Sequence, residues 1–306
     1  MAVLTMDNHA LLAESNNAHF DLPSLSDFHQ HENDWAMPDK TWVGKSFSRS
    51  ASDYDSVASL QRHVGEGLLK CLPEDGFAPR TILDLGAGTG YCTAQLARRF
   101  PDSNLIALDI AMGMLKALGQ RHDFHEQPLR VCADIERLPL KANTVDLVFS
   151  NLALQWCPDL SAVFAEFKRV LRPGGLMLFS TFGEATLSEL RKAWAKADDR
   201  HTHVNAFVST VMLESALHKA NFSDITVQNK QIVYHYASVD AILRELKLLG
   251  AHNVTMNRPR QLTGKGTFRK MMEAYSASME SGQVQASFEI IFAMAYQASV
   301  KDHEKH

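Results

Sequence analysis

Short apolar segments alternate with amphipathic ones between about residues 81 and 179, and this alternation restricts the fold more than any other feature. Five apolar segments have the length and composition of buried strands: 81–85, 105–108, 129–132, 145–149 and 176–179. Between them, apolar residues recur at three- and four-residue steps, as in 160–170. Strands that alternate with helices form a parallel sheet with helices on both faces. We therefore expect an α/β domain here.

The pattern changes after residue 182. The apolar spacing predicts helices over 185–197, 211–220, 242–249 and 268–277, and strands over 224–236 and 288–296. The two added strands bring the sheet to seven. The helices between them are expected to form a cap over its carboxyl edge, from about 183–222 and 238–280.

Composition divides the segment before the first strand into an acidic part, residues 1–40, and a part that belongs to the folded domain. Residues 1–40 contain seven acidic residues and Lys40 as their only base, with no sustained apolar period. They are expected to form a mobile or loosely docked acidic arm, which leaves 41–306 as the folded domain. A helix is predicted to begin near Ser52 or Asp53.

A glycine-rich turn follows the first predicted strand, in the run Asp84-Leu85-Gly86-Ala87-Gly88-Thr89-Gly90. Glycines tolerate positive φ and let a ligand approach the backbone, and the N-terminus of the next helix attracts an anion. The dinucleotide fingerprint requires a third glycine where this chain has Tyr91. The spacing instead favours S-adenosylmethionine, whose carboxylate is the anion. The turn residues expected to hold it are Asp84, Gly86, Ala87, Gly88 and Gly90.

Polar side chains end the next three strands, where ligands bind in open α/β sheets. Asp109 is placed to accept the ribose hydroxyls and Asp134 to accept the adenine amino group. Asn151 would face the methyl donor. Asp109 could instead be a strand-end cap, and Asp134 could form an Asx turn. The occurrence of polar side chains at the ends of three successive strands nevertheless favours a cofactor site. Two neighbouring apolar side chains, Ile110 and Ile135, are expected to line the same site.

Composition excludes several other classes of protein. The formal net charge is −4, which does not suggest a nucleic-acid partner. Four dispersed cysteines form no Cys-x-x-Cys pair, so we expect no metal site and a reducing compartment. No signal-peptide pattern and no apolar run long enough for a membrane span is visible, so a cytoplasmic location is expected.

Several segments resemble one family closely. They are Ser46-Phe47-Ser48-Arg49-Ser50-Ala51 with Tyr54-Asp55, Asn151-Leu152-Ala153-Leu154-Gln155-Trp156, Leu190-Arg191-Lys192-Ala193-Trp194, His203-Val204-Asn205, and Leu246-Lys247-Leu248-Leu249-Gly250-Ala251. In these segments the chain resembles the malonyl-[acyl-carrier-protein] O-methyltransferases of biotin synthesis, from about residue 43 to residue 297. The resemblance implies a Rossmann-like seven-stranded methyltransferase sheet with a helical cap.

The resemblance also implies a reaction, in which S-adenosylmethionine methylates the free carboxylate of malonyl-acyl-carrier protein. The ester would prime pimeloyl synthesis for biotin. A carboxylate with a pKa near ~4 is already ionised at pH 7 and needs no general base. The chain must therefore hold and orient the acceptor. The residues expected to do so are Tyr54, Gln155, Arg200, His203 and Asn205, although each also has a structural interpretation.

Other functions are open at this level. The chain could methylate another small carboxylate or acyl thioester, or it could be a non-catalytic S-adenosylmethionine-binding assembly factor. The carrier protein is acidic, so docking is expected at exposed bases near the cap. The two candidate groups are Arg191, Lys192 and Lys196, or Lys265, Arg269 and Lys270. Both groups could also be ordinary surface charges on solvated helix faces, with no partner.

Overall fold

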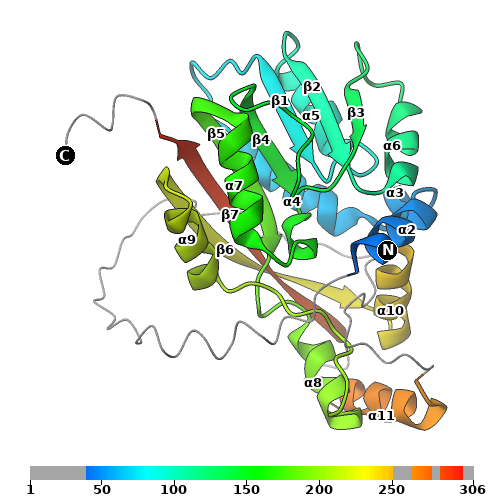
Figure 1. Ribbon diagram of the computed structural model, residues 1–306. Helices are drawn as coiled ribbons and strands as arrows, with labels where there is room; N and C mark the ends of the chain where they lie inside the picture. Colours follow the sequence, from blue (N-terminus) through cyan, green and yellow to red (C-terminus); the bar gives the residue numbers. More distant parts are fainter. Residues whose placement is uncertain (1–38, 251–262, 278–282, 299–306) are drawn as a thin grey trace.

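The computed structural model describes residues 39–250, 263–277 and 283–298 (Figure 1). Its strands form one seven-stranded sheet in the order β3-β2-β1-β4-β5-β7-β6. The strand bounds are β1 Thr81–Leu85, β2 Asn104–Asp109, β3 Leu129–Cys132, β4 Val145–Asn151, β5 Leu171–Phe182, β6 Phe222–Tyr236 and β7 Val284–Gln297. Strands β1 to β5 are parallel, and β7 runs antiparallel to both of its neighbours. The predicted seven-stranded α/β architecture is confirmed.

Helices cover both faces of the sheet and extend beyond its carboxyl edge. Their bounds are α2 Lys40–Ser50, α3 Tyr54–Val57, α4 Ser59–Lys70, α5 Tyr91–Arg99, α6 Met112–Gly119, α7 Leu160–Val170, α8 Ser188–Ala197, α9 Thr210–Lys219, α10 Val239–Leu248 and α11 Lys265–Ser276, with a short 3-10 turn η1 at Leu154–Trp156. Helices α4 and α5 share one apolar core with the sheet, and α7 and α9 share another on the opposite face. No helix among the described segments is long and apolar enough to cross a bilayer.

Helix α7 shows how the local sequence produces an element. The carboxylate of Asp159 accepts a hydrogen bond from the amide of Ala162 at 3.0 Å and so caps its N-terminus. Four apolar residues at helical spacing are buried against the sheet, namely Val163, Phe164, Phe167 and Val170. The helix ends at Val170 as predicted. The following Arg172-Pro173-Gly174-Gly175 forms an irregular start to β5, with a shift of register against β4.

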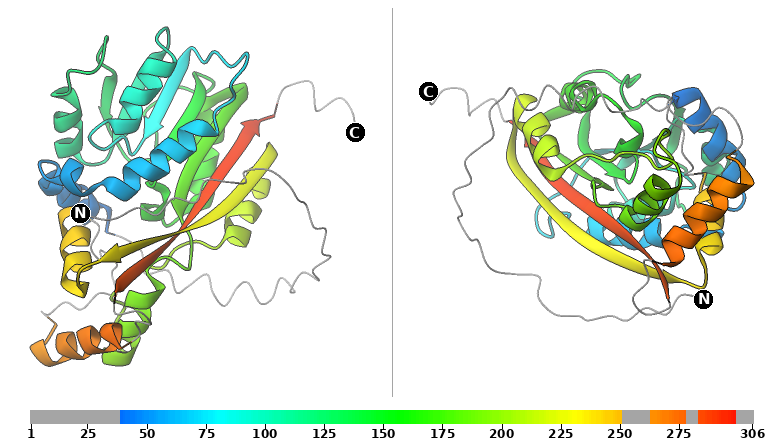
Figure 2. Two further views of the ribbon diagram at one scale, coloured as in Figure 1. Left: turned by 180° about the vertical axis from the view of Figure 1, so that it is seen from behind. Right: turned by 90° about the horizontal axis from the view of Figure 1, so that it is seen from below.

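The cap has an apolar core of its own, formed by helices that extend beyond the carboxyl edge of the sheet (Figure 1). Helices α8, α10 and α11 bury apolar side chains against the ends of β6 and β7. In this region β6 and β7 pair only with each other, and Figure 2 shows them continuing as a long two-stranded ribbon. Helix α9 lies instead beside α7 and β6, within the main helix layer.

One helix was not predicted. The helix expected to begin near Ser52 or Asp53 is divided into α3 and α4, and α2 precedes them. Helix α2 begins after Asp39, whose carboxylate accepts hydrogen bonds from the amides of Thr41 and Trp42. Lys40, which was assigned to the acidic arm, is the first residue of α2. Residues 1–38 of the predicted arm lie outside the described residues.

Candidate functional site

The glycine turn connects β1 to α5 in a conformation that few residues other than glycine adopt. Gly86 and Gly88 have φ of 68° and 57°. A side-chain carbon on Gly86 would lie 2.3 Å from the Cβ of Ala153, whereas one on Gly88 would meet no atom within 4 Å. Gly86 therefore permits close packing against the segment after β4. Gly88 leaves open space beside the backbone, which is what a bound ligand requires.

Asp109, at the end of β2, is hydrogen-bonded to this turn. One carboxylate oxygen accepts from the amide of Gly88 at 2.9 Å, and the other accepts from the amide of Ala111 at 2.7 Å. Burial raises the pKa of Asp109 to about 6, although these two amides favour its charged form. An ionised carboxylate has lone pairs left after accepting one hydrogen bond on each oxygen. Asp109 can therefore accept two ribose hydroxyls as well.

Asp84 is buried deeper, one residue before the end of β1. Its carboxylate accepts a hydrogen bond of 2.6 Å from the hydroxyl of Thr93 on α5. Burial raises the pKa of Asp84 to about 7, and the nearby charge of Asp109 adds to the effect. Asp84 thus connects the strand to the helix that follows the glycine turn.

Two cavities meet at these residues, with volumes of about 670 Å³ and about 440 Å³. Both are lined by Tyr54, Gly86, Gly88 and Asn151, so they form one continuous site. Nine of the ten predicted cofactor residues line one cavity or both, namely Asp84, Gly86, Ala87, Gly88, Asp109, Ile110, Asp134, Ile135 and Asn151. The tenth, Gly90, instead caps α5 with φ of 86°.

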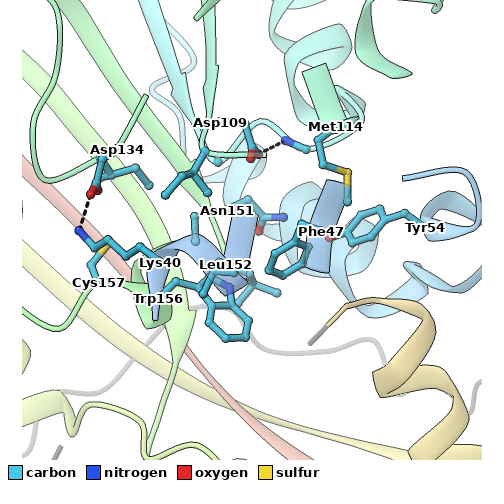
Figure 3. A pocket seen from close by; sticks show the side chains of 16 residues that line it. Lys40, Phe47, Tyr54, Asp109, Met114, Asp134, Asn151, Leu152, Trp156 and Cys157 are labelled. Carbon is cyan, nitrogen blue, oxygen red and sulfur yellow. Dashed lines mark hydrogen bonds and ion pairs between the residues drawn. The ribbon is translucent and has the colours of Figure 1, made fainter. Parts of the chain in front are cut away.

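The larger cavity ends at the loop after β3 (Figure 3). There Asp134 makes the Asx-type hydrogen bond considered above, from the amide of Glu136 at 3.0 Å. Its second oxygen accepts from the ammonium of Lys40 at 2.6 Å. Ile135 is buried on the same wall. A carboxylate beside an apolar side chain suits an adenine ring, because the ring has an amino group on one edge and two apolar faces.

The smaller cavity ends near α4 and the start of α5. Arg62 is the one arginine among its lining residues, and its guanidinium donates to the carbonyl of Asp55 at 2.7 Å. The carboxylate of Asp55 accepts a hydrogen bond of 2.6 Å from the hydroxyl of Thr89. The amide oxygen of Gln61 is buried and, within the described residues, has no hydrogen-bond partner. A cation and an unpaired acceptor suit the carboxylate and the ammonium of an amino-acid group.

Three aromatic side chains line the larger cavity (Figure 3). The ring of Phe47 lies edge-on to Trp156, with centroids 5.4 Å apart, and to Tyr54, at 6.4 Å. Burial raises the pKa of Tyr54 well above its usual value. Its phenol therefore remains protonated at neutral pH and can donate a hydrogen bond.

Asn151 lies where the two cavities meet. Its amide donates to the carbonyl of Gln61 at 2.9 Å, and its amide oxygen accepts from the hydroxyl of Ser180 at 2.8 Å. These hydrogen bonds fix the side chain between α4 and β5. The structure therefore gives Asn151 a positional role at the junction.

The predicted acceptor-holding residues do not come together with Tyr54. Gln155 and the cap residues Arg200, His203 and Asn205 are absent from the lining of both cavities. His203 stacks on Trp194 with centroids 3.8 Å apart, and its Nε2 is 2.8 Å from the carboxylate of Asp198.

The remaining three lie in different settings. Arg200 is exposed, and its backbone amide donates to Asp198. The side-chain amide of Gln155 donates to the carbonyl of Leu152 at 2.5 Å. Among the described residues, the amide oxygens of Gln155 and Asn205 are buried without a partner.

The cavity residues that were not predicted as site residues include Lys40, Phe47 and Arg62. All three precede the glycine turn by at least two dozen positions, on helices whose placement no local pattern indicates. Lys40 is the one base of residues 1–40, and its position as a single base in an acidic segment is the sequence feature that could have marked it. No group of three or more His, Cys, Asp or Glu side chains in the described part of the chain is arranged to hold a metal ion.

Comparison with known proteins agrees with this geometry. A family model described as a methyltransferase domain matches residues 83–179. The malonyl-[acyl-carrier protein] O-methyltransferase of Methylococcus capsulatus is 47% identical over 259 residues, covering 84% of this chain and 94% of that protein. The biotin biosynthesis bifunctional protein BioHC of Saccharophagus degradans is 44% identical over 250 residues, covering 78% of this chain and 43% of that one.

A solved structure shares the fold. Phosphoethanolamine N-methyltransferase 2 of Haemonchus contortus, in complex with S-adenosyl-L-methionine, matches with a TM-score of 0.54 and 18% identity, covering 82% of this chain and 57% of that chain. The expectation of an S-adenosylmethionine-dependent methyltransferase is confirmed by the family model and the relatives. With an identity of 47% across nearly the whole of a relative, the chain belongs to the malonyl-[acyl-carrier protein] O-methyltransferase family.

Proposed function

We propose that this protein transfers the methyl group of S-adenosylmethionine to the free carboxylate of malonyl-acyl-carrier protein, giving the methyl ester that primes pimeloyl synthesis for biotin. The main support is the 47% identity to a relative of that name over 94% of its length. The continuous cavity adds chemical support, because its walls offer groups suited to adenine, ribose and an amino-acid group in that order.

The cofactor residues are proposed to act by position. Asp134 and Ile135 would hold adenine, and Asp109 would accept the ribose hydroxyls. Gly88 would let the amino-acid group approach the N-terminus of α5, where backbone amides favour its carboxylate. Arg62 would pair with that carboxylate from the opposite wall. When bound, S-adenosylmethionine supplies a methyl group on a positively charged sulfur.

The acceptor needs orientation and not a base. Its carboxylate is ionised at neutral pH, and the protonated phenol of Tyr54 can donate a hydrogen bond to one oxygen. The other oxygen must remain free to attack, because binding both would stabilise the ground state. Phe47 and Trp156 exclude water from the same wall.

Gln155, Arg200, His203 and Asn205 are proposed to complete the acceptor side from outside the cavity walls. Val204 belongs to the same buried cluster as Leu152, which lines the larger cavity. This shared cluster is the support for placing the segment that contains His203 and Asn205 on the acceptor side. The buried amide of Asn205 is the group best suited to approach a substrate entering from the cap.

Docking of the carrier protein is proposed on α8 and α11. These helices pack against each other, so the two candidate basic groups lie on neighbouring helices (Figure 1). The guanidinium of Arg191 is half-buried and donates to the carbonyls of Glu184 at 2.8 Å and Thr186 at 2.9 Å, which gives it a role in holding the chain before α8. The exposed bases left for an acidic partner are Lys192, Lys196, Lys265, Arg269 and Lys270.

One experiment tests the reaction. Purified protein is incubated with methyl-labelled S-adenosylmethionine and malonyl-, succinyl- or acetyl-carrier protein. We expect label on the malonyl form alone, released by mild base as an ester would be. Label on succinyl would indicate a broader carboxyl methyltransferase. Cofactor binding without label on any acceptor would contradict the proposal and favour an assembly factor.

A further inference from the structure

One face of α2 forms a wall of the cofactor cavity. Lys40, Val43 and Phe47 line it, at helical steps of three and four residues that place them on the same side of α2. Val43 is buried, and Phe47 contacts Trp156 and Tyr54 (Figure 3). A ligand in the larger cavity would therefore lie against this face of α2.

The middle and C-terminal part of α2 are held by close backbone packing. A side-chain carbon on Gly113 of α6 would lie 2.4 Å from the carbonyl oxygen of Ser48. The amide of Gly113 donates to the hydroxyl of Ser48 at 3.1 Å. The hydroxyl of Ser46 donates to the carbonyl of Gly250, just after α10, at 3.1 Å. These contacts connect α2 to both the sheet domain and the cap.

The N-terminal end of α2 is held by charge. The ammonium of Lys40 lies 2.6 Å from a carboxylate oxygen of Asp134 and also pairs with the carboxylate of Glu136. The side chain of Lys40 is 25% exposed, so solvent screens these ion pairs less than it would on an open surface. Burial lowers the pKa of Lys40, but the two carboxylates outweigh this and hold it above its usual value.

The position of the ion pair connects α2 to cofactor binding. Asp134 is the carboxylate suited to the adenine amino group, so Lys40 contacts the residue that would contact the cofactor. With Lys40 on one oxygen and the amide of Glu136 on the other, the carboxylate of Asp134 is fixed in one orientation. Each oxygen still has a lone pair for the adenine amino group.

We propose that Lys40 is a positioning residue that holds α2 closed over the adenine end of the cofactor cavity through its ion pairs with Asp134 and Glu136. The inference rests on the assignment of this cavity to S-adenosylmethionine and is independent of the acceptor. It predicts that the ion pair slows escape of the cofactor and of its demethylated product, since α2 forms one wall of the cavity proposed to hold both.

The test measures dissociation of S-adenosylhomocysteine from the full chain by stopped-flow chase with excess competitor. Lys40→Met removes the charge and keeps the apolar stem, and it should release the ligand about tenfold faster, equivalent to about 1.4 kcal/mol. Lys40→Arg keeps the charge and should stay within about twofold of wild type. Lys45→Met, on the exposed side of the same helix, is the matched control and should not change the rate.

Salt dependence separates a positioning role from a loss of packing. Raising the salt concentration should speed dissociation from wild type more than from Lys40→Met, because salt weakens only the ion pair. If Lys40→Met does not fold, Glu136→Gln replaces it, since Glu136 does not line the cavity, and about threefold faster release is expected. If these variants release the ligand at the wild-type rate, the inference about Lys40 is overturned but the cofactor assignment is not. Failure of wild type to bind the ligand would overturn the cofactor assignment with it.

Discussion

The amide of Gly88 donates a hydrogen bond of 2.9 Å to the carboxylate of Asp109, which joins the glycine turn after β1 to the end of β2. The same carboxylate is placed to accept the ribose hydroxyls. Because burial raises its pKa to about 6, protonation of Asp109 competes with cofactor binding near neutral pH. Two hydroxyl donors require the charged form, so binding favours ionisation.

The cofactor affinity should therefore depend on pH in a defined direction. Above pH 7 Asp109 is already ionised before the cofactor binds, so the Kd should not change with pH. Below pH 6 the Kd should rise by up to about tenfold per pH unit, because a proton must leave before the hydroxyls can donate. Calorimetric titration with S-adenosylhomocysteine from pH 5 to 8 measures this. Asp109→Asn should bind more weakly at pH 8 with a flatter profile; an equally steep profile would contradict the assignment.

The buried carboxylate of Asp84 should make the stability of the ligand-free protein depend on pH in the opposite direction to cofactor affinity. Its pKa is about 7 in the folded state, well above the ordinary value of an aspartate, because burial disfavours the charged carboxylate. The folded state thus binds the proton more tightly than the unfolded state, and stability falls as pH rises from about 4 to about 7. The shift in pKa corresponds to about 4 kcal/mol. Urea unfolding of Asp84→Asn should lose less stability than wild type between pH 5 and pH 8.

Gly86 and Gly88 should respond differently to alanine. At Gly86 the added carbon would clash with Ala153 and φ is 68°, so Gly86→Ala should lower the free energy of unfolding by about 2–4 kcal/mol. At Gly88 the space is open and only the φ of 57° is unfavourable, so the loss should be about 1 kcal/mol. Cofactor binding should nevertheless be lost in Gly88→Ala, because the added carbon occupies the ligand's space. Denaturation and cofactor binding measured on Gly86→Ala and Gly88→Ala would show whether the loss of stability and the loss of binding occur separately.

Arg62 should act on the cofactor and not on the acceptor. Arg62→Met removes the cation at the amino-acid end of the cavity, and the KM for S-adenosylmethionine should rise about tenfold or more. The KM for malonyl-carrier protein should change by less than about threefold. Arg80→Met, exposed at the start of β1, is the control. A larger effect on the acceptor than on the cofactor would reassign this end of the cavity.

The docking proposal predicts an effect confined to the carrier protein. Lys196→Glu with Lys270→Glu reverses charge on α8 and α11, and the KM for malonyl-carrier protein should rise about tenfold while cofactor affinity stays unchanged. Lys141→Glu, before β4 at the amino end of the parallel strands, is a control with one charge reversal away from α8 and α11. Raised salt should weaken docking to wild type more than to the double variant. An unchanged KM in the double variant would rule out this surface.

The sheet could be predicted from sequence because its signal is local. Strands such as β1 and β4 are buried on both faces, so they appear as continuous apolar runs, and the helices between them have regular apolar spacing. The glycine turn and the acids after β2 and β3 were located for the same reason. Each follows directly from a strand whose end the sequence marks.

The rest depends on contacts that no local pattern contains. Helix α2 buries few side chains, and its place is set by Gly113 and Gly250, which are distant in sequence. Lys40 therefore could not be connected to Asp134. In the cap, His203 stacks on Trp194 and pairs with Asp198, and no local pattern in the sequence brings these three side chains together.

The ribbon of β6 and β7 has a consequence for how this enzyme could diversify. The chain leaves the sheet along β6, builds α10 and α11, and returns along β7 into the same sheet. Those two helices are thus an insertion between paired strands, with both attachment points fixed by the ladder. A chimera that exchanges residues 237–283 between relatives would retain every residue that lines the two cavities, so α10 and α11 could be replaced together as one unit.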